Sequence, residues 1–475
     1  MINGLNLTAL LPSAARVSTS ARVGIAPASV NKASPADDAS TKVMFGSQTS
    51  EIAAVYSLMP KKVNPAIAEQ QHSQIQGLMG LASGGTSTSI SAFATLGSTL
   101  LSNLNDNRGD VVQTLRGADM GIARAANDSA ISMDIVTQSG TKVQLVMSQQ
   151  DDGMTVQLKT DGEALNDDEA AAIAGLGKAL GETLSGLGKQ QPQLDISGLT
   201  QFDTRLLKSV DLKTDLRNDD KSLQSLNFHA DNKTRSTAYE DGDFSLKMSS
   251  DMAHSAFAGN AAQQQIALSA WDSKFDKART AGQGNYDQMA ALKAVFRALN
   301  SNTSAETMPV VATNAIRIGD NGASQLSGLN DFSLSLTQTE KSVNPAKLQE
   351  KDRFAYTASQ STEANAHSDS SKSVKQTTRS NLSAAWHQAI DPSIPLALGT
   401  QKSSQSYYYH VVENSEENST TLNYNGRGQL ANVQHHQQVD NRETVKKYLL
   451  GKLVDESLNP EKYSRSWGLD ILGKL

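Results

Sequence analysis

The stretch 130–160, AISMDIVTQSGTKVQLVMSQQDDGMTVQLKT, is the strongest indication of the fold class. Apolar and polar residues alternate in three runs, which contain Ile131, Met133 and Ile135, then Val143, Leu145 and Met147, then Met154, Val156 and Leu158. Alternation at period two turns one face of a strand toward a core. Gly140 and the pair Asp152-Gly153 separate the runs, and Asp-Gly between alternating runs is a strong hairpin signal. The stretch therefore predicts a three-stranded antiparallel meander with one buried face.

A helix is expected directly after this meander, over about 167–187. Asn166 is a suitable N-cap, and Glu169 three residues later completes the capping-box arrangement. An apolar stripe follows at helical spacing, made of Ile173, Leu176, Leu180, Leu184 and Leu187. We expect this stripe to cover the meander.

The order of strands followed by helices recurs twice along the chain. Strands are predicted near 207–216, 223–230, 233–239 and 243–249, and helices near 261–281 and 285–300. A further strand-rich block runs from 329 to 440, with alternation at Phe332, Leu334 and Leu336 and a hairpin turn at 425–428. A loop at 413–418 and a closing helix at 442–456, with Val445, Leu449 and Leu453, complete this block.

The N-terminal region has a different character. Residues 1–48 are rich in Ser, Ala, Thr and Pro without periodicity, which predicts a disordered tail. Ile90, Phe93, Leu96, Leu100 and Leu104 recur at helical spacing, and Val111, Val112 and Leu115 continue the pattern less cleanly. We therefore expect a helical segment over 49–128.

These patterns predict an α+β fold, with antiparallel β-meanders each covered by amphipathic helices, because strand runs and helix runs segregate. The expected divisions follow the shifts in pattern. They are a disordered tail at 1–48, a helical segment at 49–128, an α+β domain at 129–300, a linker at 301–325 and a β-rich block with a C-terminal helix at 326–475.

The composition excludes several classes of function. The formal net charge is −6, and lysine and arginine never form a basic block, so we expect no nucleic-acid binding. The chain has no cysteine, which rules out disulfides, thiolate metal sites and cysteine nucleophiles. No apolar run approaches the ~20 residues of a membrane helix. The protein is expected to be soluble, and either cytoplasmic or exported by a route that needs no cleaved signal peptide.

Two glycine-rich stretches look like phosphate-binding loops. Gly175, Gly177 and Gly181 lie inside the predicted helix, where small residues favour close helix packing rather than a ligand. The stretch 468–474 resembles a P-loop, but Leu475 follows it and no helix can begin there. Neither stretch predicts a nucleotide site.

The histidines and tyrosines favour structural roles. His435 and His436 are neighbours in a strand and point to opposite faces, so they cannot bind one metal ion together. His410 is expected to pair near Thr421, away from both. Among Tyr407, Tyr408 and Tyr409, alternation places the first and last in the core and Tyr408 at the surface. The sequence thus assigns no catalytic, cofactor-binding or metal-ligating residue, and no cofactor.

One resemblance bears on function. The stretches LDISGLTQFDTRLLKSVDLKTDL (194–216) and LQSLNFHAD (223–231) are similar to uncharacterised proteobacterial proteins of the pseudomonad type, some of which carry a lactate-dehydrogenase label. That label implies NAD and a 2-hydroxy acid. The sequence lacks the features that NAD binding needs. It has no unit in which a strand is followed by a glycine-rich loop and a helix, and it shows no βαβ alternation. No residue is carried over.

Three functional hypotheses follow. The first is a bacterial non-enzymatic interaction or structural protein, with an unknown protein partner and export left open. The second is a carrier of a small apolar ligand or lipid, with an interior lined by Met133, Met147, Phe228, Phe244 and Met248. The third is the oxidoreductase that the resemblance implies.

Overall fold

The computed structural model describes the greater part of the chain after residue 85. The described residues are 54–56, 86–105, 111–116, 129–150, 153–189, 191–217, 223–252, 258–301, 320–366 and 372–471. The predicted disordered tail at 1–48 lies outside them, as does most of the predicted linker, of which 320–323 form the short helix α7 (Asp320–Ala323).

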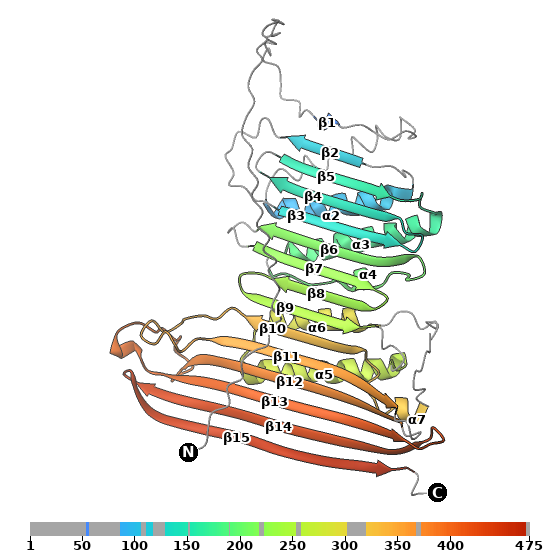
Figure 1. Ribbon diagram of the computed structural model, residues 1–475. Coiled ribbons are helices and arrows are strands. Elements are labelled where there is room, and N and C mark those ends of the chain that lie inside the picture. Colours follow the sequence, from blue (N-terminus) through green and yellow to red (C-terminus); the bar gives the residue numbers. More distant parts are fainter. Residues whose placement is uncertain are drawn as a thin grey trace, which may run out of the picture. The chain divides into compact units, whose positions relative to one another are not determined.

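All described strands belong to one sheet of fifteen strands, in which every neighbouring pair is antiparallel (Figure 1). Their order across the sheet is β1-β2-β5-β4-β3-β6 and then β7 to β15 in sequence. The three expected blocks therefore share one sheet. The strands are β1 (Ala54–Tyr56), β2 (Val111–Arg116), β3 (Ser129–Thr137), β4 (Lys142–Gln150), β5 (Gly153–Asp161), β6 (Leu207–Arg217), β7 (Leu223–Asp231), β8 (Thr234–Glu240), β9 (Phe244–Asp251), β10 (Asp331–Gln338), β11 (Arg353–Ala366), β12 (Lys372–Ala389), β13 (Tyr407–Tyr424), β14 (Leu430–Leu449) and β15 (Lys452–Asp470).

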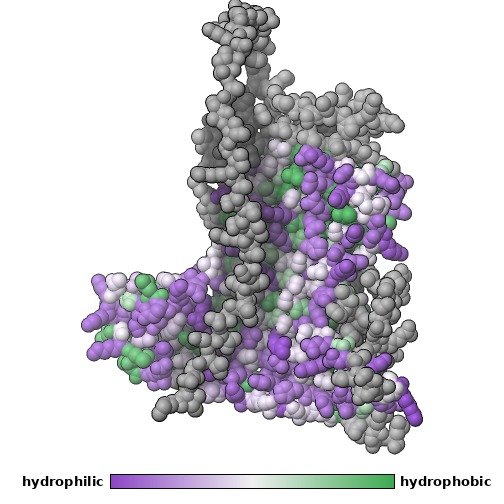
Figure 2. All heavy atoms as spheres, in the orientation of Figure 1, coloured by the Kyte–Doolittle hydropathy of each residue, from purple (hydrophilic) through white to green (hydrophobic). Residues whose placement is uncertain are grey.

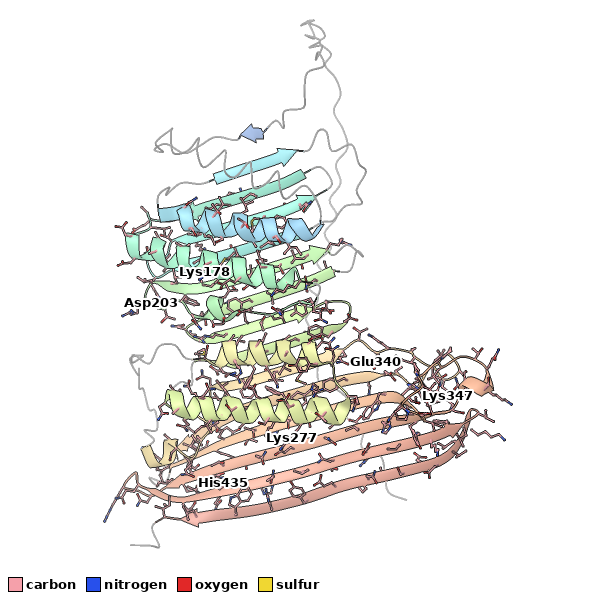
Figure 3. The ribbon with its side chains drawn as sticks, turned by 180° about the vertical axis from the view of Figure 1, so that it is seen from behind. Lys178, Asp203, Lys277, Glu340, Lys347 and His435 are labelled. Carbon is pink, nitrogen blue, oxygen red and sulfur yellow. The ribbon has the colours of Figure 1, made fainter. Side chains whose placement is uncertain are left out.

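The longer helices lie on one face of this sheet, as Figures 1 and 3 show from opposite sides. They are α2 (Thr86–Ser102), α3 (Asp167–Leu187), α4 (Ser197–Thr200), α5 (Ala261–Gly282) and α6 (Tyr286–Asn300). Short 3-10 turns occur at Asn103–Asn105 and Lys402–Ser404. The chain thus combines helices with an antiparallel sheet, as predicted, although strand predominates.

The predicted meander forms as β3, β4 and β5. Ile131 pairs with Met147 and Met133 pairs with Leu145, so the alternating apolar residues share one face. The next helix also begins where the sequence indicates. The Asn166 side chain accepts a 2.8 Å hydrogen bond from the backbone N–H of Glu169, and the Glu169 carboxylate accepts one of 3.3 Å from the backbone N–H of Asn166. This capping box is typically worth about 1 kcal/mol. The meander and its helix are confirmed.

One packed core lies between the sheet and the helices. All five residues proposed to line a ligand cavity, Met133, Met147, Phe228, Phe244 and Met248, have side chains at most 5% exposed within it. Under α5 and α6 the core is aromatic: Trp271, Phe275, Phe296, Phe332 and Tyr356 pack edge-on or tilted, with ring centroids 5.0 to 6.0 Å apart. Figure 2 views the opposite face, where hydrophilic residues predominate on the described part.

The predicted helix at 442–456 is wrong. Those residues form the end of β14, a two-residue turn at Leu450 and Gly451, and the start of β15. Both turn residues have positive φ, 49° and 81°, as a type I′ turn requires. The spacing of Val445, Leu449 and Leu453 suits a helix. The residues nevertheless form strands, because β14 pairs along its length with β13 on one side and β15 on the other.

Two other expectations are corrected. The helical segment at 49–128 holds α2, but Val111 to Arg116 form β2, because β-branched residues there pair with β5. The loop at 413–418 is absent, since β13 runs unbroken from Tyr407 to Tyr424. His410 therefore pairs with Val445 instead of lying near Thr421. The turn at 425–428 is confirmed, with a hydrogen bond from Gly428 N–H to Asn425 O.

Candidate functional site

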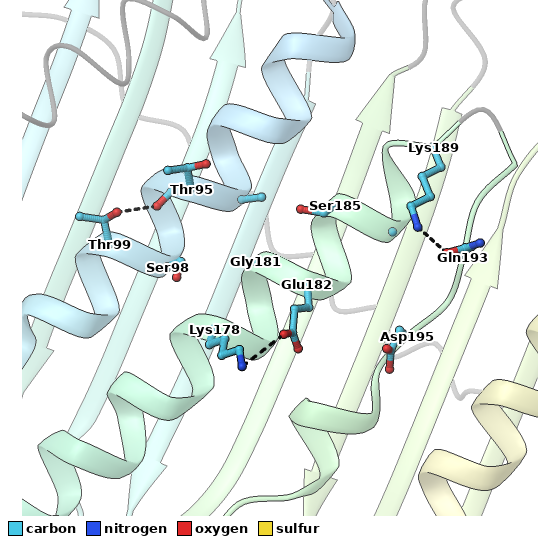
Figure 4. A pocket seen from close by; sticks show the side chains of 12 residues that line it. Thr95, Ser98, Thr99, Lys178, Gly181, Glu182, Ser185, Lys189, Gln193 and Asp195 are labelled. Carbon is cyan, nitrogen blue, oxygen red and sulfur yellow. Dashed lines mark hydrogen bonds and ion pairs between the residues drawn. The ribbon is translucent and has the colours of Figure 1, made fainter.

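A polar groove of about 510 Å³ lies between α2 and α3 (Figure 4). Its charged side chains already have partners: Lys178 Nζ lies 3.7 Å from Glu182 Oε1, Lys189 donates to the Gln193 amide, and Asp195 accepts from Ser197. The hydroxyls of Thr95 and Thr99 donate to carbonyls of their own helix. Neither hydroxyl is therefore poised beside a general base, and we assign no chemistry to this groove.

Two of the three glycines singled out in α3, Gly177 and Gly181, allow close helix packing as predicted, whereas a Cβ atom at Gly175 would meet nothing within 4 Å. A Cβ atom at Gly177 would lie 3.0 Å from Leu101 Cβ and from Ser98 O on α2. At Gly181 it would lie 3.3 Å from Ala94 O. Both glycines face α2 in the middle of a continuous helix, where the backbone N–H groups are already bonded.

A buried cluster of charges lies where residues 344–352 and 396–405 pack on the end of β12 to β14. The carboxylate of Glu350 accepts hydrogen bonds of 2.6 Å from Tyr407 and 2.8 Å from Tyr448. His387 Nδ1 lies 2.6 Å from Asp352 Oδ1, and its Nε2 lies 3.6 Å from Glu350 Oε2. Lys347 Nζ lies 3.1 Å from the centroid of the Tyr448 ring.

The protonation of this cluster follows from its contacts. Burial alone would raise the pKa of Glu350, but the His387 side chain, the two tyrosine hydroxyls and Lys347 lower that pKa to about 2. Burial would lower the pKa of His387, but Asp352 and Glu350 raise it above its usual value. These contacts therefore favour the ionised form of Glu350 and the protonated form of His387.

The geometry of the cluster favours anchoring over catalysis. The His387 side chain is fully buried and that of Glu350 is only 10% exposed. Asn344 and Gln405 exchange two 2.9 Å hydrogen bonds beside Tyr407 and join the two loops. A substrate has no access to the carboxylate of Glu350, so we interpret the cluster as the attachment of both loops to the sheet.

A more accessible set of polar and aromatic side chains lies on β13, β14 and β15, on the helix side of the sheet but beyond α5. Two cross-strand rows define it: Thr420 pairs with His435 and then Trp467, and Asn418 pairs with Gln437 and then Arg465. Together with Glu416, Glu461 and Tyr463, these residues form what we call the β13–β15 face. Its side chains are Glu416, Asn418, Thr420, His435, Gln437, Glu461, Tyr463, Arg465 and Trp467.

Hydrogen bonds run across this face from helix to edge strand. Lys274 of α5 donates 3.2 Å to Glu416, and Asn418 and Gln437 donate 2.8 and 3.0 Å to the same carboxylate. Arg465 Nε donates 2.7 Å to Gln437 Oε1. His435, labelled in Figure 3, accepts or donates a 3.0 Å bond with Thr420.

The edge of this face is aromatic and exposed. The guanidinium of Arg465 lies 5.2 Å from the Trp467 ring and 5.8 Å from the Tyr463 ring. His435 stacks on Trp467 at 5.3 Å. The exposed fractions of Trp467 and Tyr463 are 50% and 39%, although aromatic rings are usually largely buried. This is the candidate binding site of the chain.

No protein-family model, curated protein or solved structure matches this chain. The candidate site is therefore judged on its own geometry. Among the described residues, no helix has the length and apolar character to cross a lipid bilayer. The described side chains also contain no group of three histidines, carboxylates or cysteines arranged to hold a metal ion.

The histidines and tyrosines singled out in the sequence fall in several places. His435 turns toward Thr420 and Trp467, whereas His436 bonds to Ser466 on the other face, as strand alternation predicts. Tyr407 and Tyr409 are buried and Tyr408 is partly exposed. His410 stacks on Trp386 at 4.7 Å with the rings parallel.

The sequence analysis did not identify the residues of the Glu350 cluster or the exposed row on β15. Glu350, Asp352 and His387 are joined by long-range packing, which leaves no local signal. Tyr463, Arg465 and Trp467 do carry a signal, since they alternate at period two, and Leu469 continues the row. Because a closing helix was predicted at 442–456, no strand was predicted over 463–469.

Proposed function

We propose that this chain is a non-enzymatic interaction protein that binds its partner on the β13–β15 face. The observation that carries this proposal is the exposed row Tyr463, Arg465 and Trp467, held in place by side chains of the neighbouring strands. Exposed aromatic and arginine side chains of this kind are enriched at binding surfaces. Export without a cleaved signal peptide remains part of the proposal and rests on composition alone.

The distribution of exposed apolar residues supports this location. Eight large apolar side chains between 449 and 469 are at least 39% exposed: Leu449, Leu450, Leu453, Val454, Leu458, Tyr463, Trp467 and Leu469. Of these, Tyr463, Trp467 and Leu469 lie on the same side of β15 as the β13–β15 face, whereas Leu458 lies on the opposite side. Elsewhere in the sheet, helices cover one face and the core is closed. A concentration of exposed apolar side chains in one hairpin indicates a surface used for binding.

The two other hypotheses have less support. The residues proposed to line a carrier cavity are packed in the core. The described strand pairs are all antiparallel, whereas a dinucleotide-binding unit uses parallel strands joined by helices. A fluorescence titration with NADH tests the oxidoreductase hypothesis directly, and a saturable change in NADH emission would support it.

Radical footprinting tests the interaction proposal. Trp467 and Leu458 lie on the same strand and are 50% and 56% exposed, but they point to opposite faces. Labelling by hydroxyl radicals is compared between cells that make the protein naturally and the purified chain. We expect Trp467 to be protected in cells and Leu458 to be labelled equally in both. Equal labelling of Trp467 in both states would refute the proposal.

A further inference from the structure

The β13–β15 face combines flat rings with groups that hydrogen-bond in a plane. Tyr463 and Trp467 share one side of β15, and the guanidinium of Arg465 lies between them, 5.8 and 5.2 Å from their ring centroids. Beside this row lie the amides of Asn418 and Gln437 and the carboxylate of Glu416. Rings stack on the C–H faces of a sugar, while amide, guanidinium and carboxylate groups bond to its hydroxyls.

Charge on this face argues against a polyanionic ligand. Lys274 of α5 and Glu416 form an ion pair at 3.2 Å. The face carries one further cation, Arg465, and one further carboxylate, Glu461, which accepts a 2.9 Å hydrogen bond from Asn441. A nucleic acid or a uronic-acid polymer needs a surplus of cations to replace its counterions. With Lys274 of the neighbouring α5 included, two cations are balanced by two carboxylates, which suits a neutral ligand.

The same charges argue against a protein partner of the usual kind. The centre of a protein interface is depleted of charged residues. Here Glu416 on β13 and Arg465 on β15 flank Gln437 on β14, which hydrogen-bonds to both, so two charged groups are held within the face. Hydroxyl groups of a sugar can bond to such groups without removing either from its partner.

We propose that the ligand of the β13–β15 face is a neutral polysaccharide, with its pyranose rings stacked on Tyr463 and Trp467. This inference rests on the proposed function, because it names the ligand of that same face. The guanidinium of Arg465 binds hydroxyls between the two stacked rings through Nη1 and Nη2, for which the described residues supply no acceptor. The hydrogen-bonded ladder presents these groups already ordered, which lowers the entropic cost of binding.

The test uses the full chain and soluble neutral hexasaccharides of β-1,4-, β-1,3- and α-1,4-linked glucose, with oligogalacturonate as the anionic probe. Binding is measured by calorimetry and by the change in tryptophan emission. We expect at least one neutral oligosaccharide to bind, and Trp467→Ala or Arg465→Ala to weaken that binding about tenfold or more. Tyr286→Ala is the matched control, because Tyr286 is a 70% exposed ring with the Arg279 guanidinium 5.9 Å away, far from the face in sequence and on α6.

The outcomes separate this inference from the proposed function. Binding of oligogalacturonate alone, no binding of any neutral probe at millimolar concentration, or unchanged binding by Trp467→Ala overturns the neutral polysaccharide. If Trp467 is nevertheless protected in cells, the face binds another partner and the proposed function stands. A dimer that dissociates on Trp467→Ala would identify that partner as a second copy and would likewise overturn the polysaccharide.

Discussion

Arg465 on the edge strand β15 donates a 2.7 Å hydrogen bond from Nε to Oε1 of Gln437 on β14. This bond fixes the plane of the guanidinium between the rings of Tyr463 and Trp467 and leaves its outer nitrogens toward solvent. An arginine is costly to order, because its side chain loses much rotational freedom. The chain orders this one on an exposed strand, which is why we regard the face as a binding surface.

The proline of β15 is expected to protect the open edge of the sheet. β15 has only β14 as a neighbour among the described strands, and a proline in a sheet is tolerated where its missing N–H would face outward. Pro460→Thr restores an edge donor, so we expect concentration-dependent association in sedimentation velocity. Asn459→Thr, next in the strand, is the control and stays monodisperse. Identical sedimentation of the two variants would contradict this role.

The turn between β14 and β15 carries a strained residue. Leu450 has φ of 49° and is 58% exposed, and its N–H donates to Ser406 Oγ at 3.1 Å. Leu450→Asn keeps that N–H and suits positive φ, so unfolding should become less favourable by about 1 kcal/mol. Chemical denaturation measures the change. Leu449→Asn, on the ordinary strand backbone, should give no gain, and an equal gain there would rule out the turn as its cause.

Two glycines of α3 give a matched pair for helix packing. A Cβ atom at Gly175 meets nothing within 4 Å, so Gly175→Ala should stabilise the chain by about 0.5–1 kcal/mol through helix propensity. At Gly177 the same atom lies 3.0 Å from atoms of α2. Gly177→Ala should therefore show no such stabilisation, and its free energy of unfolding should fall by about 1 kcal/mol relative to the wild-type chain. Melting temperatures that rise equally in both variants would show that α2 does not pack as described.

The Glu350 cluster should make stability depend on pH. The raised pKa of His387 means that its contribution is full below about pH 6.5 and is lost as pH rises through the folded value. The lowered pKa of Glu350 means that its contribution is full above about pH 4.5 and is lost as pH falls toward 2. The stability difference between the wild-type chain and His387→Gln is therefore largest between pH 4.5 and 6.5. Urea midpoints from pH 3 to 9 measure it, and a constant difference would contradict the assigned charges.

Local sequence predicted those elements whose partners lie nearby in the chain. The meander from Ile131 to Leu158 and the capping box at Asn166 and Glu169 depend on contacts within a few tens of residues, and both are confirmed. The region around Val445 failed although its partner strands are its neighbours in sequence, because the four-residue spacing of Val445, Leu449 and Leu453 suits a helix and hides the turn at Leu450 and Gly451.

The candidate site was less predictable because its contacts form only when strands pair. His387 meets Asp352 only when β11 and β12 pair, and Arg465 meets Gln437 only when β14 and β15 pair. Neither contact leaves a spacing that a motif could record. The alternating row from Tyr463 to Leu469 was readable, but an exposed and a buried aromatic strand look alike in sequence.

The most direct test of the β13–β15 face is photo-cross-linking from two positions of one strand. A diazirine amino acid is placed at Leu469, on the same face of β15 as Trp467, or at Leu458 on the opposite face; these residues are 51% and 56% exposed. Each variant is irradiated in cells that make the protein naturally. We predict a cross-linked adduct from position 469, lost when Arg465→Ala is added, and none from position 458. Equal yields from both positions, or an adduct that survives Arg465→Ala, would contradict the account.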